Sequence, residues 1–233
     1  MRSYLYFTYA GYGFIIIAGL ASMFSQMFVR SSYSKYSKIS TISGKTGADV
    51  ARQILNNKGI NDVEVIQSRG GTLSDHYDPT KKVVALSPKV YADDSIASVS
   101  VAAHEVGHAI QHAESYGFIA LRNKVLPLAI ISSKFSFIPL FFGFMADNQQ
   151  MFNIGILLLS IIAIFQLVTL PVEFDASNRA IKILRQEQIL TSSELAGSKK
   201  MLTAAALTYV AALFGTIMSI LRYVAIFNNR NRD

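Results

Sequence analysis

The sequence has no cysteine and no tryptophan among its 233 residues, and only 16% of the residues are charged. Without cysteine there is no disulfide framework, no thiolate metal site and no cysteine nucleophile. Soluble domains usually carry about 25% charged residues, so this shortage indicates a membrane protein. The net charge of +7 fits the lysine and arginine that collect on the cytoplasmic side of membrane spans. The sequence shows no nucleic-acid-binding motif, and we expect no nucleic-acid partner.

Long apolar runs account for the shortage of charge. A membrane-spanning helix needs about 20 mostly apolar residues, and three runs have that length: Leu5–Val29, Met151–Val172 and Met201–Leu221. A fourth run, Val125–Ala146, has Lys134 at its centre and two prolines. It predicts either a kinked span or an interfacial segment followed by a re-entrant piece. The first run is long for a signal peptide, so we expect an uncleaved anchor.

These runs predict the organisation of the chain. We expect a transmembrane anchor at 5–29, a soluble segment at 30–124, two transmembrane or kinked membrane helices at 125–172, a helix at 173–200 and a transmembrane helix at 201–226. Lysine and arginine concentrate near the span ends within 30–124 and 173–200. The positive-inside rule therefore places both segments in the cytoplasm. The prediction is a multi-pass plasma-membrane protein whose site faces the cytoplasm.

The soluble segment has the pattern of a small α+β unit. Apolar residues in Val50–Leu55 have helical spacing, with Thr46 as the expected cap and Gly59 as the expected stop. A second helix is expected at Ile96–Ala113. The predicted extended segments are Asp62–Ile66, Leu73–Tyr77 and Lys82–Leu86. The predicted fold class is an α-helical membrane protein with a small α+β domain.

The helix expected at Ile96–Ala113 contains three of the four histidines of the chain, in VAAHEVGHAIQHAE. His104 and His108 are four residues apart, so both rings leave one face of a helix and can bind one small cation. Glu105 can reach a water at that cation without being a ligand, as in the H-E-x-x-H arrangement of zinc peptidases. Gly107 keeps the intervening position small. The motif predicts one Zn²⁺ ion and a hydrolytic enzyme with Glu105 as its base.

A catalytic zinc needs a third protein ligand and keeps its fourth position for water. His112 lies about 12 Å from His104 along a helix axis, so we expect it beside the site or on the helix surface. Glu173, directly after an apolar run, is the candidate carboxylate, and its neighbour Asp175 could compete with it. A new helix is expected to begin at Glu173, and the alternative role of that carboxylate is to stabilise the helix start.

Five segments resemble the bacterial YugP-type neutral zinc metallopeptidases: SGKTGADVA, LSDHYDP, VAAHEVGHAIQHAE, QLVTLPVEFDAS and AALTYVAA. The resemblance extends over nearly the whole chain. HEVGH followed by EFDAS also resembles the HtpX-like gluzincins. These resemblances imply a zincin-like domain and a membrane-bound zinc endopeptidase. They imply His104, His108 and Glu173 as zinc ligands and Glu105 as the catalytic base.

The resemblance also suggests residues that support the ligands or bind substrate. The HtpX-like pattern has an aspartate where this sequence has Ser177, and Asp175 or Ser177 is expected to take its place, with His112 nearby. In those proteins a sheet edge precedes the H-E-x-x-H helix, and peptides commonly bind such an edge as an added strand. The corresponding substrate-binding residues are Leu73, Ser74, Asp75, His76 and Tyr77. The candidate oxyanion donors are His76, Tyr77 and Tyr209.

Two other functions are compatible with the sequence. One is a zinc-dependent membrane scaffold or chaperone, and the other is a zinc hydrolase acting on a non-peptide membrane substrate. Glu105 argues against the first, because a structural zinc site has four protein ligands and needs no base. The expected partners are a peptide or membrane-protein substrate and the lipid bilayer. The sequence does not indicate an oligomeric state.

Overall fold

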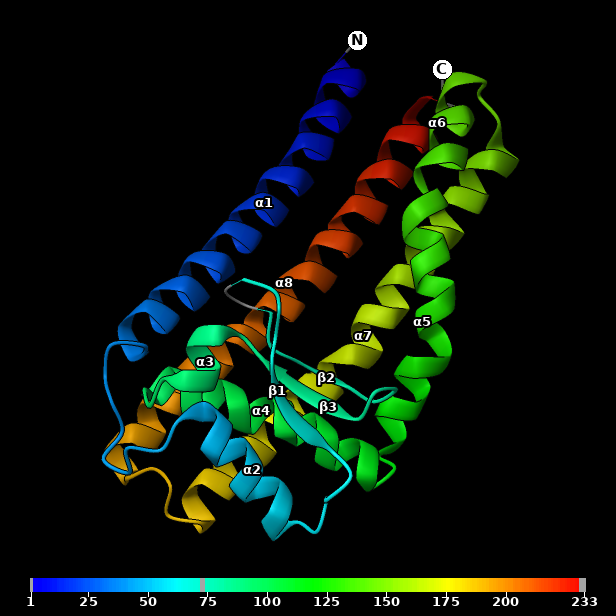
Figure 1. The fold of residues 1–233 in the computed structure, drawn as a ribbon. Coiled ribbons are helices and arrows are strands. Elements are labelled where there is room, and N and C mark those ends of the chain that lie inside the picture. The colour runs from blue at the N-terminus through cyan, green and yellow to red at the C-terminus, as the bar shows by residue number, and fades with distance from the viewer. Residues whose placement is uncertain (1, 72–73, 231–233) are drawn as a thin grey trace. The chain divides into compact units, whose positions relative to one another are not determined.

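The computed structural model describes residues 2–71 and 74–230, and most of them are helical (Figure 1). The elements in chain order are α1 (Arg2–Tyr36), α2 (Gly47–Asn57), β1 (Glu64–Gln67), β2 (His76–Asp78), β3 (Val83–Leu86), α3 (Pro88–Ala92), α4 (Ile96–Ala113), α5 (Gly117–Phe135), α6 (Phe137–Met145), α7 (Gln149–Gln186) and α8 (Ser192–Arg230). Long apolar helices and one small sheet confirm the predicted fold class.

The chain forms two compact units. The first, which we call the helical unit, consists of Met1–Gln26, Ala120–Leu170 and Leu207–Asp233. The second, the mixed unit, consists of Met27–Ile119 and Pro171–Ala206. Helices α1, α7 and α8 contribute residues to both units.

The sheet of the mixed unit has three short strands in the order β1-β3-β2. β1 runs parallel to the central β3, and β2 runs antiparallel to it, with Tyr77 opposite Val84. The strands lie near the predicted positions, although β2 begins three residues later than the expected extended segment. Among the described residues β2 is an edge strand, so it pairs on one side only.

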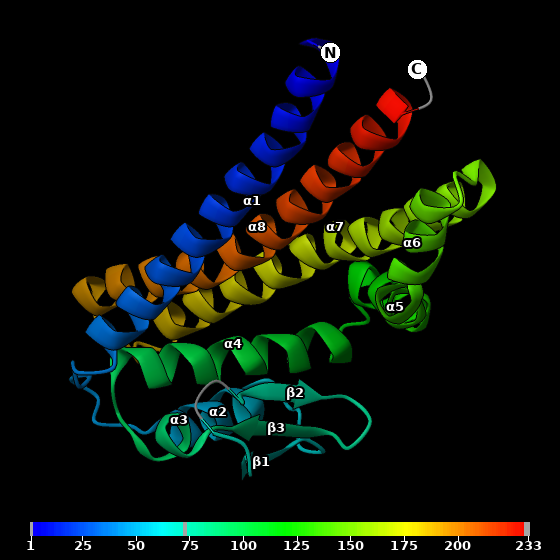
Figure 2. The ribbon, with the colours of Figure 1, turned by 90° about the horizontal axis from the view of Figure 1, so that it is seen from above.

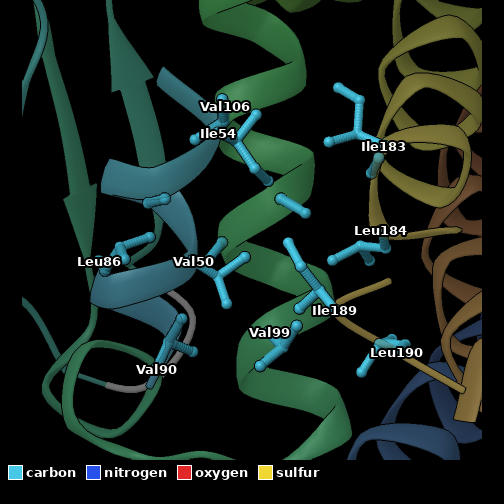
Figure 3. Packing of buried hydrophobic residues seen from close by; sticks show 14 of the residues in the cluster. Val50, Ile54, Leu86, Val90, Val99, Val106, Ile183, Leu184, Ile189 and Leu190 are labelled. Carbon is cyan, nitrogen blue, oxygen red and sulfur yellow. The ribbon is translucent and has the colours of Figure 1, made fainter. Parts of the chain in front are cut away.

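Helix α4 lies between the sheet and the part of α7 that belongs to the mixed unit (Figure 2). Its bounds, Ile96–Ala113, are those predicted from the sequence. Fully buried Val99 and Val106 on α4 face Val50 and Ile54 of α2 on one side. Ile183 and Leu184 of α7 cover the other side (Figure 3). This two-sided burial explains why α4 has so many small apolar residues, and it gives the helix a fixed position.

The expected cap and stop of the first soluble helix are confirmed. Thr46 is the N-cap of α2 and forms a capping box with Asp49, in which each side chain accepts a hydrogen bond from the backbone N–H of the other residue. Such caps contribute roughly 1 kcal/mol. Gly59 follows the helix with φ of +69°, a left-handed conformation that favours glycine.

The expectation that a new helix begins at Glu173 is wrong. Helix α7 is continuous from Gln149 to Gln186 and includes Pro171, and a separate helix α8 begins at Ser192. Proline removes one backbone donor, but the residues after it bury a helical stripe against the mixed unit. The buried side chains of that stripe are Val172, Ala176, Ala180, Ile183 and Leu184. Their spacing of three and four residues keeps the helix intact, so Glu173 lies within it and does not cap it.

Four helical segments of the described chain are long and apolar enough to cross a membrane: Gly11–Tyr36, Gly117–Met145, Gln149–Gln186 and Ser192–Phe227. The second consists of α5 and α6, separated at Ser136, whose backbone is still in the right-handed helical region. This geometry favours a kinked span over a re-entrant piece for Val125–Ala146. Phe24, Ile131 and Leu157 are exposed on these helices, as lipid-facing residues would be.

Close packing between α4 and α7 depends on Gly107. A Cβ atom at this position would lie 2.8 Å from the carbonyl oxygen of Ala176 and 3.3 Å from its Cα. These are backbone atoms of a helix and cannot rotate away. The absent side chain therefore allows α7 to pass directly over the turn of α4 that carries the histidine pair.

Gly107→Ala should lower the stability of the mixed unit by about 1–3 kcal/mol, because the added methyl group pushes α7 away from α4. Thermal unfolding of the detergent-purified protein measures the change. Gly117→Ala is the matched control, since nothing lies within 4 Å of the Cβ that it adds. Equal melting temperatures for the two variants would contradict the close approach at Gly107.

Candidate metal centre

His104 and His108 occupy one face of α4, one turn apart. The helix starts in a defined place because the side chain of Ser95 accepts a hydrogen bond from the backbone N–H of Ser98. The two imidazole rings are perpendicular to each other, with centroids 4.8 Å apart. The spacing of four residues therefore produces the paired arrangement that the sequence predicted.

Glu173 of α7 brings a carboxylate to this pair. Its Oε2 lies 3.4 Å from Nε2 of His104 and 3.7 Å from Nε2 of His108. The side chain of Glu173 is buried. Among the described residues these three form the one group of histidine, aspartate or glutamate side chains able to hold a metal ion, with their ligand atoms within 4.8 Å of one another.

The spacing of these atoms fits a zinc ion. Tetrahedral zinc has bonds of about 2.0–2.2 Å to nitrogen and oxygen, so its ligand atoms are about 3.3–3.5 Å apart. The two distances from Glu173 Oε2 are close to this range. Two imidazoles and one carboxylate are also a donor set of catalytic zinc sites with an open fourth position.

Asp175, the other candidate carboxylate, is used elsewhere. Its Oδ2 accepts hydrogen bonds from Nε2 of Gln111 at 2.8 Å and from Nε of Arg179 at 2.5 Å. Arg179 also pairs with Glu114 at the end of α4. Asp175 thus belongs to a polar network beside the histidines and is not part of the three-residue group.

Each histidine of the pair has a partner for its second ring nitrogen. Ser177 Oγ lies 3.2 Å from Nδ1 of His104, and Gln111 Oε1 lies 3.0 Å from Nδ1 of His108. Ser177 is one of the two residues expected at this position. The sequence analysis did not single out Gln111. The available signal was its position, since it is a polar residue three positions after a histidine on a helix with a small apolar face.

The charges around the pair favour a cation. Burial disfavours the charged carboxylate and raises the pKa of Glu105, and the negative charges of Glu173 and Asp75 act in the same direction. For His108, burial alone would lower the pKa. The hydrogen bond to Glu173 and the charge of Glu105 outweigh burial and raise it. Two carboxylates beside two imidazoles thus leave an excess of negative charge for a metal ion to balance.

The remaining predicted site residues have different positions. His112 does not join the three-residue group, and its Nδ1 lies 3.4 Å from the hydroxyl of Tyr77 on β2. His76 is exposed, with Nδ1 2.8 Å from the carbonyl oxygen of Ser74. Asp75 Oδ1 accepts a hydrogen bond from the backbone N–H of Ser87, which connects the start of β2 to the segment after β3.

Two further predicted residues are not seen at the site. Leu73 lies outside the described residues, and Tyr209 belongs to the helical unit.

Comparisons with known proteins show the family of this chain. Residues 12–228 match the model of a family described as "Putative neutral zinc metallopeptidase". The chain is 48% identical over 219 residues to a protein of Bacillus subtilis (strain 168) named "Putative membrane protease YugP", an alignment that covers 93% of this chain and 96% of that protein. No solved structure matches the chain. With the family model covering most of the sequence and the apolar helices present, the chain is a membrane protein that belongs to the "Putative neutral zinc metallopeptidase" family.

Proposed function

We propose that this protein is a membrane-embedded zinc endopeptidase that binds one Zn²⁺ through His104, His108 and Glu173. The observation that carries the proposal is the position of Glu173, whose Oε2 lies between the two Nε2 atoms at 3.4 and 3.7 Å. The family description and the membrane protease from Bacillus subtilis support the same activity. A bound zinc ion would supply Lewis acidity and lower the pKa of a water to about 7.

Glu105 is the proposed general base. It follows His104 on α4 and is adjacent to the ligand group without belonging to it. Its role is to accept the proton of the attacking water and to pass that proton to the leaving amine. A pKa raised by burial moves the carboxylate toward the value at which one group both accepts and releases a proton near neutral pH.

The arrangement also supports a relation to the HtpX-like gluzincins. The third proposed ligand is a glutamate on a later helix, as the resemblance implies. Ser177, which replaces the aspartate of that pattern, contacts Nδ1 of His104 at 3.2 Å. We propose that the hydroxyl of Ser177 hydrogen-bonds to His104 and orients its ring, the role that the aspartate carboxylate would have.

The proposed substrate site is the free edge of β2. This strand packs against α4 and is an edge among the described residues. A peptide in extended conformation can add to such an edge through main-chain hydrogen bonds. The segment Ser74–Tyr77, with Leu73 before it, would then hold the substrate backbone, and His76, Tyr77 and Tyr209 stay the proposed oxyanion donors.

We also propose that the protein lies in the plasma membrane with its metal centre facing the cytoplasm. The support is the concentration of lysine and arginine in 30–124 and 173–200. The same segments provide all three proposed ligands. The domain limits 5–29, 30–124, 125–172, 173–200 and 201–226 stay a proposal. Within 173–200, the helix that carries Glu173 is the end of α7, which stops at Gln186, and α8 begins at Ser192.

Glu105→Gln should retain one zinc per chain and lose peptide cleavage by about 10²–10⁴-fold, since the amide cannot accept the proton. Zinc content and cleavage of a quenched fluorescent peptide library, measured on detergent-purified protein, test this. Glu64→Gln makes the same chemical change at an exposed position of β1 and should leave both unchanged.

Two further variants separate metal binding from catalysis. His108→Ala and Glu173→Ala should each lose zinc, because a three-ligand site that loses one ligand binds the ion much more weakly. Normal cleavage by Glu105→Gln, or full zinc content in Glu173→Ala, would contradict the proposed mechanism. A zinc-loaded wild-type protein that cleaves no peptide would favour a non-peptide substrate or a scaffold.

Methylation of single backbone nitrogens in a cleaved peptide tests the β2 edge while the enzyme stays intact. Where a peptide N–H pairs with the strand, kcat/KM should fall by about 5–100-fold, the equivalent of one lost hydrogen bond of about 1–3 kcal/mol. The effect should alternate along the peptide, because every second N–H of a strand faces its neighbour. A uniform response at all positions would contradict strand addition.

A further inference from the structure

Gln111 is a fully buried polar residue at the metal centre, and neither the proposed ligand set nor the catalytic base includes it. It lies on α4, three residues after His108, so its side chain is on nearly the same face of the helix. Its amide has three hydrogen-bond partners, one on α4 and two on α7. Burying this amide without partners would cost about 1–3 kcal/mol, so the three bonds determine how it is oriented.

The partners on α7 determine which amide atom faces which helix. Nε2 lies 2.8 Å from the carbonyl oxygen of Val172 and 2.8 Å from Oδ2 of Asp175. The carbonyl oxygen can only accept a hydrogen bond, and Oδ2 of Asp175 already accepts one from Nε of Arg179. The NH₂ group must therefore point toward α7, because it alone has two hydrogens to donate.

The opposite end of the amide then determines the proton position on His108. Oε1 of Gln111, 3.0 Å from Nδ1 of His108, has no hydrogen to donate. Nδ1 must therefore be the N–H donor of this contact. With the proton of the imidazole placed on Nδ1, Nε2 is the nitrogen whose lone pair is available to a metal ion.

His104 lacks an equivalent constraint. Its Nδ1 lies 3.2 Å from the hydroxyl of Ser177, and a hydroxyl donates or accepts equally well. The two histidines of the pair thus have partners of different kinds. The amide at His108 admits one tautomer, whereas the hydroxyl at His104 admits either.

The same amide also connects the two helices that provide the proposed ligands. Val172 directly precedes Glu173, and Asp175 follows it by two residues, so Gln111 contacts α7 on both sides of the third ligand. Asp175 is held in turn by Arg179, which reaches Glu114 at the end of α4. One buried side chain thereby orients a histidine on α4 and the helical turn that presents Glu173.

We propose that Gln111 is a positioning residue of the metal centre: it selects the metal-binding tautomer of His108 and holds the Glu173 turn of α7 in place. This role rests on the proposed function, because it requires that His108 and Glu173 bind the ion. Partners of this kind around a zinc site typically change metal affinity by about 10–100-fold when they are removed.

Gln111→Met keeps the length of the side chain and removes both its donors and its acceptor. We expect its zinc dissociation constant, measured by chelator competition, to rise by about 10–100-fold, and the absorption spectrum of the Co²⁺-substituted protein to change. The chain has four histidines, so ¹⁵N-histidine NMR of the metal-free protein gives an independent readout. The wild-type spectrum should show a protonated Nδ1 on His108, and the spectrum of Gln111→Met should show the loss of that proton.

A compensating pair of substitutions keeps the test informative if Gln111→Met folds poorly. Gln111→Glu alone places a second carboxylate next to that of Asp175, and the two repel each other. This variant should therefore bind zinc weakly. Adding Asp175→Asn removes one of the two opposed carboxylates and offers an amide N–H to the other. The double variant should therefore bind zinc more tightly than Gln111→Glu. A double variant no better than the single one would overturn the proposal.

Ser100→Ala is the matched control. Ser100 is also fully buried on α4, and its hydroxyl hydrogen-bonds to Ser198 of α8 and to the carbonyl oxygen of Ile96, neither of which is a proposed ligand. It should lower thermal stability without changing zinc affinity or the His108 tautomer. Wild-type zinc affinity in Gln111→Met together with loss of zinc in His108→Ala would overturn the role of Gln111 alone. Retention of zinc by His108→Ala would instead show that the proposed function is wrong.

Discussion

The candidate metal centre depends on one buried carboxylate oxygen, Glu173 Oε2, which lies 3.4 Å from His104 Nε2 and 3.7 Å from His108 Nε2. A buried carboxylate without compensation costs several kcal/mol. Here the imidazoles, or an ion bound among them, provide that compensation. The carboxylate and the histidines come from separate helices, so the arrangement exists only while α4 and α7 stay in direct contact.

That contact is possible because α4 has no side chain at the point of closest approach and because both helices bury apolar side chains. Gly107 has no side chain at the point where the backbone of Ala176 passes over α4. Val99 and Val106 bury the opposite face of α4 against α2, and Ile183 and Leu184 bury the end of α7 (Figure 3). Protein interiors are packed as tightly as organic crystals, so this core leaves the two helices little freedom to separate.

Hydrogen bonds also hold α4 and α7 together, in addition to the apolar packing. Gln111, Asp175 and Arg179 form a connected set of hydrogen bonds between α4 and α7, and every bond joins a donor to an acceptor. Fully satisfied buried networks stabilise a unique arrangement, whereas incomplete ones are costly. The position of the ligands is thus determined by directional bonds as well as by shape. Since α7 also contains a segment apolar enough to cross a membrane, the third proposed ligand is carried on the same helix as that segment.

Several features could be predicted from the sequence because their causes are local. The bounds of α4, the Thr46 cap and the left-handed Gly59 follow from nearby residues. The pairing of His104 with His108 follows from helical spacing alone. The existence of four long apolar segments follows from composition.

Other features were decided by tertiary structure. The sequence suggested a helix start at Glu173, yet α7 continues through Pro171 because Val172, Ala176 and Ala180 are buried against the mixed unit. The sequence favoured Glu173 over its neighbour Asp175, but only the structure shows that Glu173 alone of the two lies with the histidine pair. The partners of Gln111 could not be predicted from the sequence, since Val172 and Asp175 are 61 and 64 residues away. Local sequence determines which faces a helix has, but which residues meet across two helices depends on how those helices pack.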